Sequence, residues 1–451
     1  MDTPVLVAPR TDDVADSQSS RSILSPIILY GTFGLLLFNP LAFGAVEPWS
    51  VFILETGATL LFVLWAVWQV GSGELRVLGS PLFLPMLAFG LLVALQLATG
   101  RTSYRYATQS AALLYCAYGL LCFLTVQSLR RGYQIKALAW LFSGYGAGLA
   151  LFALIQGISS NGKLYWLRTP RSGGWIYGPY VNHNHYAGLM EMLVPIPLIV
   201  ALDQSIPAAR RATAAVAAAL MATTIFLSGS RGGMLAFAVE MAILGAVLIR
   251  RGKSRKVALT LGAFLLLVVG MLTWLGGGEL TARIASVRTD AHPDLSTSMR
   301  LNIDRDALKM FSRKPILGWG LGVFPTIYPQ YRSFYTNMFV NQAHNDYVQL
   351  LVELGALGFA TMLWFLGVSY YRGVKKLNNW TKDPNGAVAL AALLGITGIL
   401  VHSLVDFNLQ IPANAALFYV LCSVAAMKPR FGTFSRMRSR RRHHEAEGLS
   451  A

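Results

Sequence analysis

Long apolar runs constrain this chain more than any other feature of its sequence. Stretches of about 18 to 25 residues recur along its 451 positions, which is the length that an α-helix needs to cross a bilayer core. Core helices of water-soluble proteins are usually shorter and keep a polar face. Only 13% of the residues are charged, against roughly 25% in soluble domains. The sequence therefore predicts an all-α, polytopic transmembrane helix bundle.

Twelve spans are predicted, with one long loop between the ninth and the tenth. The spans cover residues 23–43, 50–70, 82–99, 107–127, 136–157, 185–202, 212–228, 233–249, 257–276, 347–370, 387–405 and 412–428. The resulting parts are a disordered tail 1–21, a membrane bundle 22–276, a loop 277–346, a second membrane part 347–428 and a basic tail 429–451. Acidic residues and the lack of periodicity indicate disorder in the first tail.

The net charge of +17 is a topology signal once it is mapped onto this division. If the N-terminus lies inside, inner segments hold 24 of the 38 Lys and Arg residues, and outer segments other than the long loop hold 6. The positive-inside rule then places both termini in the cytoplasm and loop 277–346 outside. The basic tail near Arg436–Arg442 is interpreted as a cluster beside anionic head groups rather than a nucleic-acid site. All three cysteines fall in apolar runs, so neither disulfides nor thiolate metal sites are indicated.

The long loop is expected to form a lid on the outer surface of the bundle rather than an independent domain. Capping side chains at 296–298 predict a helix that extends to about Ser312. Apolar residues at helical spacing give this helix one face: Ile303, Ala307 and Met310. Pro315 ends the helix, and the aromatic residues between 324 and 335 favour a membrane–water interface.

A polar hexapeptide, Gln342–Tyr347, opens the tenth span and contains His344. A helix that starts there directs its free N–H groups and positive dipole end toward the polar segment before it. Histidine is the side chain best suited to move a proton near neutral pH, and Asn345 or Asp346 is placed to bond its second nitrogen. The alternative is a helix-capping or interfacial histidine.

Two arginines are candidates for binding a phosphate. Arg231 lies in the turn Ser228–Gly233 between two spans, where an arginine is costly unless it is paired or faces a polar cavity. The alternative is a plain tight turn with a snorkelling arginine. Arg300, or its neighbour Arg305, can bind phosphate bidentately from the loop helix. The alternative there is a solvated face whose arginines pair with neighbouring aspartates.

Two further polar stretches lie at the predicted outer rim. Asn182 and His185 belong to the start of the sixth span, where two histidines at i, i+2 suit metal poorly. They are interpreted as a hydrogen-bonding rim that contacts sugar hydroxyls or caps the helix. His402 and Asp406 are spaced i, i+4 and are expected to pair on one helix face, joining helices; Asp406 can instead orient a catalytic group.

These stretches resemble the O-antigen ligase and polymerase (Wzy-C) superfamily of integral membrane glycosyltransferases. The matching pieces are Asn182–Gly188, Ser228–Gly233, Ser298–Arg300 with Pro315–Gly320, Ala343–Tyr347 with Glu353–Gly355, and His402–Asn414. The resemblance runs in scattered motifs from about 180 to 425. The block that ends in His344 is the most specific of them.

The resemblance implies transfer of a glycan from undecaprenyl diphosphate to an acceptor hydroxyl outside the membrane, without nucleotide, metal or other cofactor. It assigns the essential histidine to His344 and the diphosphate to Arg231 and Arg300. The protein is then expected in the bacterial inner membrane, among lipids and other assembly proteins of envelope polysaccharides. Whether the acceptor is a glycan, a lipid or a protein stays open, and so does the choice between ligase, polymerase and protein O-glycosyltransferase.

Two other classes of function remain open from the sequence. A secondary transporter of a small anion such as bicarbonate can also have twelve spans and carboxylates within them: Glu55, Glu191, Glu240 and Glu353. A scaffold in a polysaccharide-export complex is the third class. We find no repeat between the two halves of the chain, and the polar residues gather at one rim, so the enzyme is favoured.

Overall fold

The computed structural model describes residues 24–73, 75–169, 175–250, 255–285, 297–336, 339–380 and 383–427. The predicted tails 1–21 and 429–451 lie outside these ranges, as does the basic cluster in the second tail. Within the described ranges the regular elements are helices, and the only β pairing consists of two isolated bridges. The prediction of an all-α membrane protein is confirmed.

Every predicted span corresponds to a helix or to two consecutive helices. Ten are long and apolar enough to cross a membrane by length and composition: α2 (Leu24–Leu41), α3 (Pro48–Gly71), α5 (Arg105–Ser128), α6 (Gly132–Ile158), the pair α7 (His183–Leu193) and α8 (Pro195–Leu202), α9 (Ala208–Leu227), α10 (Arg231–Arg250), α11 (Arg255–Ala285), α14 (Asp346–Lys376) and α15 (Pro384–His402). Two apolar helices are shorter, α4 (Phe83–Ala98) and α16 (Pro412–Ala426). The sixth span is divided because Pro195 begins a new helix.

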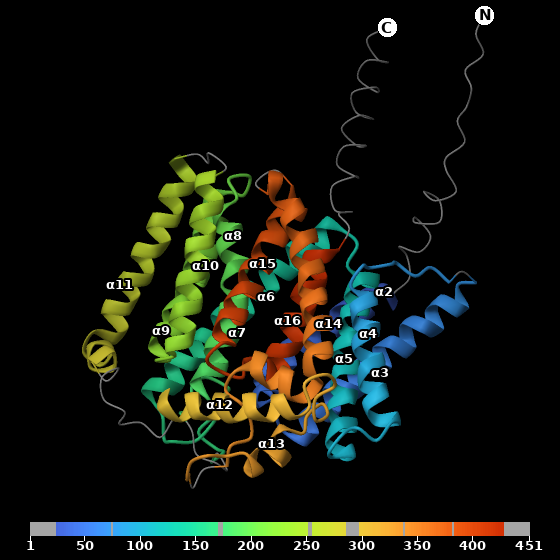
Figure 1. The fold of residues 1–451 in the computed structure, drawn as a ribbon. Coiled ribbons are helices and arrows are strands. Elements are labelled where there is room, and N and C mark those ends of the chain that lie inside the picture. The colour runs from blue at the N-terminus through green and yellow to red at the C-terminus, as the bar shows by residue number, and fades with distance from the viewer. Residues whose placement is uncertain are drawn as a thin grey trace, which may run out of the picture.

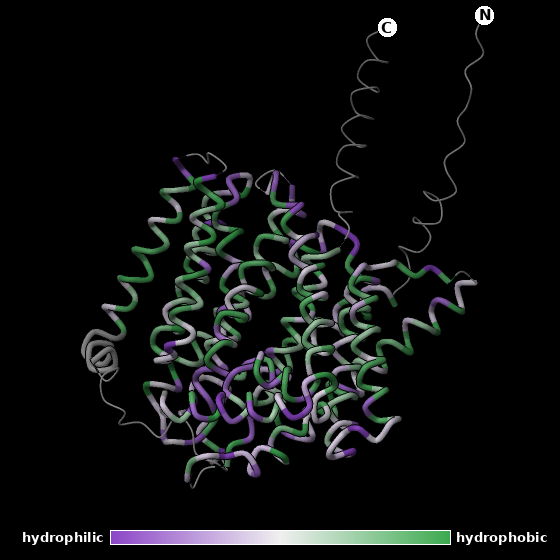
Figure 2. Tube along the Cα trace, viewed as in Figure 1, coloured by the Kyte–Doolittle hydropathy of each residue, from purple (hydrophilic) through white to green (hydrophobic). Residues whose placement is uncertain are grey.

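The helices form a bundle whose centre is α7 with α8, α15 and α16, because most of their residues are buried. One further helix, α12 (Thr297–Arg313), lies across one end of the bundle, roughly at right angles to the others (Figure 1). We call this the α12 end. Polar segments gather there, whereas the helices above it are mostly apolar (Figure 2). The described chain enters and leaves the bundle at the opposite end (Figure 1).

The loop helix matches its prediction in extent and in orientation. Its face of Ile303, Ala307 and Met310 is fully buried and packs in one apolar cluster with Val348 and Val352 of α14. The short helix α13 (Phe324–Ile327) and the 3₁₀ turn η3 (Tyr328–Gln330) complete this cluster. The loop region is therefore a covering of the bundle end and shares its apolar core with α14.

Part of the loop goes deeper than a surface lid. Helix α14 is interrupted at Gly355, whose φ is 66°, and the loop supplies the missing backbone partners. The N–H of Trp319 donates to the carbonyl of Val352 at 2.9 Å, and the N–H of Ala356 donates to the carbonyl of Pro315 at 2.7 Å. The expectation of a lid lying on the surface therefore fits α12 but not Pro315–Gly322, which is inserted against α14.

A glutamine on α4 bonds both the inserted loop segment and α14. The side-chain Nε2 of Gln96 donates to the carbonyls of Leu317 at 2.6 Å and Glu353 at 3.0 Å. The space is so tight that a Cβ at Gly318 would lie 2.4 Å from the backbone of Glu353. The two glycine-containing motifs, 315–320 and 353–355, are thus the two sides of one backbone contact.

Candidate active site at the α12 end

His344 stands immediately before α14 in a constrained backbone position. Its φ is 58°, a left-handed conformation that is uncommon outside glycine and that concentrates at functional sites. On one side Asn345 caps α14, because its Oδ1 accepts the N–H of Tyr347 at 3.1 Å. On the other side the Oε1 of Gln349 accepts the N–H of Ala343 at 2.9 Å. The chain on both sides of the histidine is therefore fixed by hydrogen bonds.

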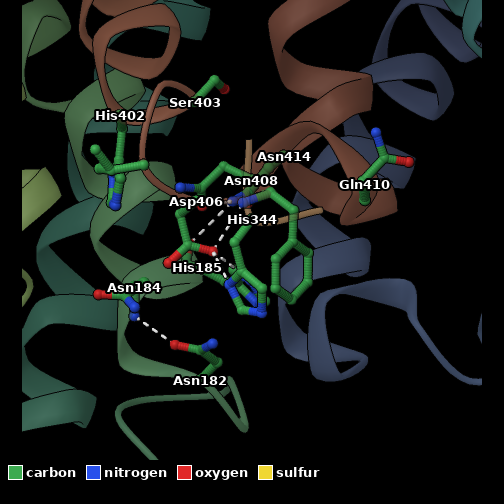
Figure 3. Close-up of polar contacts among 12 residues, drawn as sticks. Asn182, Asn184, His185, His344, His402, Ser403, Asp406, Asn408, Gln410 and Asn414 are labelled. Carbon is green, nitrogen blue, oxygen red and sulfur yellow. Dashed lines mark hydrogen bonds and ion pairs between the residues drawn. The ribbon is translucent and has the colours of Figure 1, made fainter. Parts of the chain in front are cut away.

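The imidazole of His344 faces a carboxylate from a different helix connection. Its Nδ1 lies 3.9 Å from Oδ1 of Asp406, and its ring contacts the ring of Phe407 edge-to-face at 4.7 Å. The side chain is 12% exposed, so the ring is enclosed but reachable. Figure 3 shows the histidine directed at Asp406.

Asp406 is the residue at which the site converges. Besides His344, the Nε2 of His185 lies 3.7 Å from its Oδ1, and the Nη1 of Arg300 lies 3.3 Å from its Oδ2 (Figure 3 shows the two histidines). The N–H of Phe407 donates to Oδ1 at 2.8 Å. Only 1% of the Asp406 side chain is exposed, so these groups are what stabilises its charge.

Arg300 rather than Arg305 points into the site. Its Nη1 donates to the carbonyl of Val405 at 2.6 Å and to Asp406 at 3.3 Å. Among the described residues, no acceptor is recorded for its Nη2 or Nε. Arg305 is exposed on another face of α12. Nη1 of this arginine is therefore held by the protein, and Nη2 and Nε remain available to donate to a ligand.

The electrostatics favour a neutral imidazole beside an ionised carboxylate. Burial lowers the pKa of His344 to about 4, and the charges of Arg300 and His185 add to this lowering while Asp406 opposes it. Burial also disfavours a charged Asp406, but the adjacent His185 and the charge of Arg300 outweigh it and hold the pKa of Asp406 well below its usual range. At neutral pH, His344 is thus an unprotonated base.

Asp346 holds the start of α14 and does not contact the catalytic candidate. Its carboxylate accepts three hydrogen bonds, from the Ser403 hydroxyl at 2.7 Å, the Leu409 N–H at 3.0 Å and the Gln410 side chain at 3.1 Å. Sequence reasoning expected Asn345 or Asp346 to bond the second nitrogen of His344. The structure instead gives Asn345 and Asp346 other partners, and the carboxylate nearest to Nδ1 is that of Asp406.

The expected pair of His402 and Asp406 does not form through their side chains. Helix α15 ends at His402, so the i, i+4 relation no longer places both side chains on one face. His402 instead contacts Glu191 of α7, with 2.8 Å between Nδ1 and Oε1. Asp406 is free to face the site, as the alternative interpretation required.

The start of α7 combines capping with a contact to the site. Asn182 is the N-cap, and its Oδ1 accepts the N–H of Asn184 at 2.8 Å, which confirms the capping interpretation. His185 is directed at Asp406, whereas His183 packs against Trp175 with ring centroids 4.6 Å apart. The two histidines therefore point apart, as i, i+2 spacing in a helix requires.

Comparison with known families places this geometry in context. Residues 216–363 match the family model described as O-antigen ligase (Wzy_C). This segment, about a third of the chain, is similar to an O-antigen ligase domain. No curated protein matches the chain significantly. The matched segment contains Arg231, Arg300 and His344, whereas His185 and Asp406 lie outside it.

Within the matched segment, Arg231 is the first residue of α10 and its side chain is exposed. It is tied to the same end of the bundle as His344 through its neighbour, because the Ser230 hydroxyl lies 3.4 Å from Nε2 of His402. Arg231 forms no ion pair with any residue that the structure describes. The arginine that sequence reasoning placed at costly depth is therefore unpaired and open to the surroundings at the α12 end.

Sequence reasoning missed the residues that brace His185. Asn414 donates from Nδ2 to the carbonyl of His185 at 2.9 Å, and its Oδ1 accepts from the hydroxyl of Tyr180 at 2.9 Å. The only sequence signal was the polar content of Asn408–Asn414. Its amide positions could not be assigned to α7, more than 200 residues earlier, without knowledge of the helix packing.

The candidate site thus brings together a neutral imidazole, an ionised carboxylate and an arginine with free donors. Such a set can accept a proton from a hydroxyl and stabilise negative charge on a departing oxyanion. Within the described ranges, no group of three or more His, Cys, Asp or Glu residues is arranged to hold a metal ion.

Proposed function

We propose that the protein transfers a glycan from an undecaprenyl-diphosphate donor to an acceptor hydroxyl on the outer face of the bacterial inner membrane. The observation that carries the proposal is the convergence of His344 and Arg300 on Asp406 at the polar end of a membrane bundle. The O-antigen ligase match supports a ligase- or polymerase-type function. Lipid diphosphates present their head groups at a membrane surface, where the α12 end would lie.

The reaction would be a single displacement. The acceptor oxygen bonds to the anomeric carbon of the donor sugar, and the bond from that carbon to the diphosphate oxygen breaks. His344 takes the hydroxyl proton at Nε2, because Nδ1 faces Asp406. The lipid diphosphate leaves with the bonding electrons, so the configuration at the anomeric carbon inverts. General-base catalysis of this kind contributes about 10²–10⁴-fold.

The arginines would hold the leaving group. Arg300 presents its unused donors beside the base, and Arg231 adds a second guanidinium at the same end. A planar guanidinium binds two phosphate oxygens at once, and in a poorly hydrated site its charge stabilises the departing diphosphate more than in water. Neither metal nor nucleotide is needed for this division of roles.

A transfer assay with matched variants tests the proposal. The purified protein in proteoliposomes is supplied with undecaprenyl-diphosphate-linked glycan and acceptor from the envelope of its host. His344→Gln and Arg300→Ala should each lower transfer by about 100-fold or more, whereas Arg305→Ala on the same helix should retain it. Wild-type transfer by His344→Gln would remove the histidine from catalysis.

A secondary transporter keeps one observation in its favour. Glu240 lies within α10, is fully buried, and neither carboxylate oxygen has a hydrogen-bond partner among the described residues. Buried ionisable groups in membrane helices often mark an ion path. Uptake of labelled bicarbonate into the same proteoliposomes, lost in Glu240→Gln but not in His344→Gln, would favour the transporter. A scaffold would tolerate all of these substitutions.

A further inference from the structure

A buried ionisable pair lies beside the catalytic candidates and takes no part in the reaction described above. Glu191 of α7 and His402 at the end of α15 are 0% and 1% exposed, with Oε1 and Nδ1 2.8 Å apart. Burying two such groups costs desolvation, and an apolar pair of similar volume is often as stable or more stable. The pair therefore calls for an explanation other than stability.

The pair forms the surface on which the turn carrying Arg231 rests. The Ser230 hydroxyl is 3.4 Å from Nε2 of His402. A Cβ at Gly232 would lie 2.4 Å from Cδ2 of His402, and a Cβ at Gly233 would lie 3.0 Å from Oε1 of Glu191. The residue before the arginine and the two residues after it thus all contact the pair or lie directly against it.

A chain of hydrogen bonds connects Glu191, His402, Ser230 and Gly233. In the tautomer in which Nδ1 of His402 donates to the Glu191 carboxylate, Nε2 of the neutral ring accepts from the Ser230 hydroxyl. The same hydroxyl oxygen accepts the N–H of Gly233 at 3.1 Å, which caps the first turn of α10. Glu191 therefore fixes the tautomer of His402, and His402 fixes the start of α10.

The segment that begins with His402 also holds the other parts of the site. Ser403 bonds Asp346 at the start of α14, the Val405 carbonyl bonds Arg300, and Asp406 faces His344. The start of α14, helix α12 and the turn before α10, which are distant in sequence, thus all contact one short segment. The contact through His402 is what ties the Arg231 turn to this segment.

We infer that His402, oriented by Glu191, is a positioning residue. It holds Arg231 at the position, relative to Arg300 and His344, from which the guanidinium can bind the same lipid diphosphate. This inference rests on the proposed function, because it takes the ligand of Arg231 to be that diphosphate. Neither His402 nor Glu191 touches the ligand in this arrangement. Their effect passes through the backbone of the turn.

Binding of undecaprenyl diphosphate to the full-length protein in nanodiscs tests the inference without knowledge of the glycan. Arg231→Ala should weaken binding by about tenfold or more, the loss of one charge-assisted contact. The combined variant Glu191→Met with His402→Leu keeps the volume of the pair and should fold, yet weaken binding to a similar extent. Adding Arg231→Ala to it should bring little further loss, because the changes act on one contact.

The controls separate positioning from folding. Glu240→Gln removes another buried carboxyl, one that lies against Gly398 rather than the turn, and should bind as the wild type does. The affinity for undecaprenyl monophosphate should differ less between the variants, because one phosphate needs fewer guanidinium groups. Thermal unfolding of each variant confirms that it is folded.

Two results would overturn the inference, and they differ. If Arg231→Ala weakens binding but the folded pair variant binds as the wild type does, the positioning role is wrong and the diphosphate clamp stands. If Arg231→Ala itself leaves binding unchanged, the clamp in the proposed function is wrong and the positioning role is lost with it.

Discussion

Replacing Asp406 by Asn tests the electrostatic support of His344. Asparagine has nearly the same size, and its carbonyl can still accept the N–H of Phe407, which donates to Oδ1 of Asp406 at 2.8 Å. The substitution removes a negative charge 3.9 Å from Nδ1 of the imidazole. Because His344 becomes positively charged as it takes the proton, losing this carboxylate should raise the barrier.

The magnitude follows from the distance. Two unit charges 3.9 Å apart attract by about 4 kcal/mol at an effective dielectric constant of about 20. With about half of the charge developed on the imidazole in the transition state, the loss is about 2 kcal/mol, or roughly 30-fold in rate. The carboxylate also faces Arg300, so a weaker hold on the donor should add to the effect on KM.

Single-turnover transfer at saturating donor, measured against pH, separates these effects. In the wild type the rate should rise as the pH increases through about 4, the pKa of His344, and stay level above it, because the neutral ring is the base. Asp406 raises that pKa, so Asp406→Asn should shift the rise to lower pH and lower the plateau. Asp306→Asn, a buried aspartate of α12 that bonds Lys309, is the control. An unchanged plateau and pH profile in Asp406→Asn would refute the electrostatic role.

Two further predictions concern stability, and both are measured by thermal unfolding. Gly355→Ala should lower the unfolding midpoint, because alanine resists a φ of 66° by roughly 1 kcal/mol or more and its Cβ would lie 2.3 Å from the carbonyl oxygen of Ile316. Gly367→Ala is the control, because that position has open space around it, and it should leave the midpoint unchanged. Equal midpoints for the two variants would contradict the contact between Gly355 and the loop. Burial raises the pKa of Asp304 to about 6, so folding stability falls as the pH rises from about 4, the ordinary pKa of an aspartate, to about 6 and stays lowered above that. Asp304→Asn should therefore stabilise the protein at pH 8 and much less at pH 5; the opposite trend would show that its charge is paired.

Much of the fold was predictable because span length and helix periodicity are local properties of the sequence. The twelve apolar runs gave helices in the right places, and the spacing of Ile303, Ala307 and Met310 gave the buried face of α12. Gly355 was different. A glycine within a span is tolerated in lipid, so nothing local indicated that this one interrupts α14 to receive the loop.

The candidate site was predictable in its residues more than in its pairings. His344 and Arg300 do come together, but through Asp406, whose partners come from α7, α12 and the start of α14. The spacing of His402 and Asp406 suggested a pair, and the end of α15 at His402 prevented it. Glu191 was noted only as a carboxylate within a predicted span. Which helix it would face depends on packing between segments about 200 residues apart, which no local pattern encodes.

The interruption in α14 also bears on how the protein is made. In the part of the chain that the structure describes, the carbonyls of Val352 and Glu353 and the N–H of Ala356 bond to Pro315–Gly320 and to Gln96. An exposed peptide group in hydrocarbon costs several kcal/mol. During biosynthesis, α14 therefore cannot settle in the bilayer as a finished helix until that preceding stretch has docked. Membrane integration of α14 and completion of the candidate site should therefore be one cooperative event.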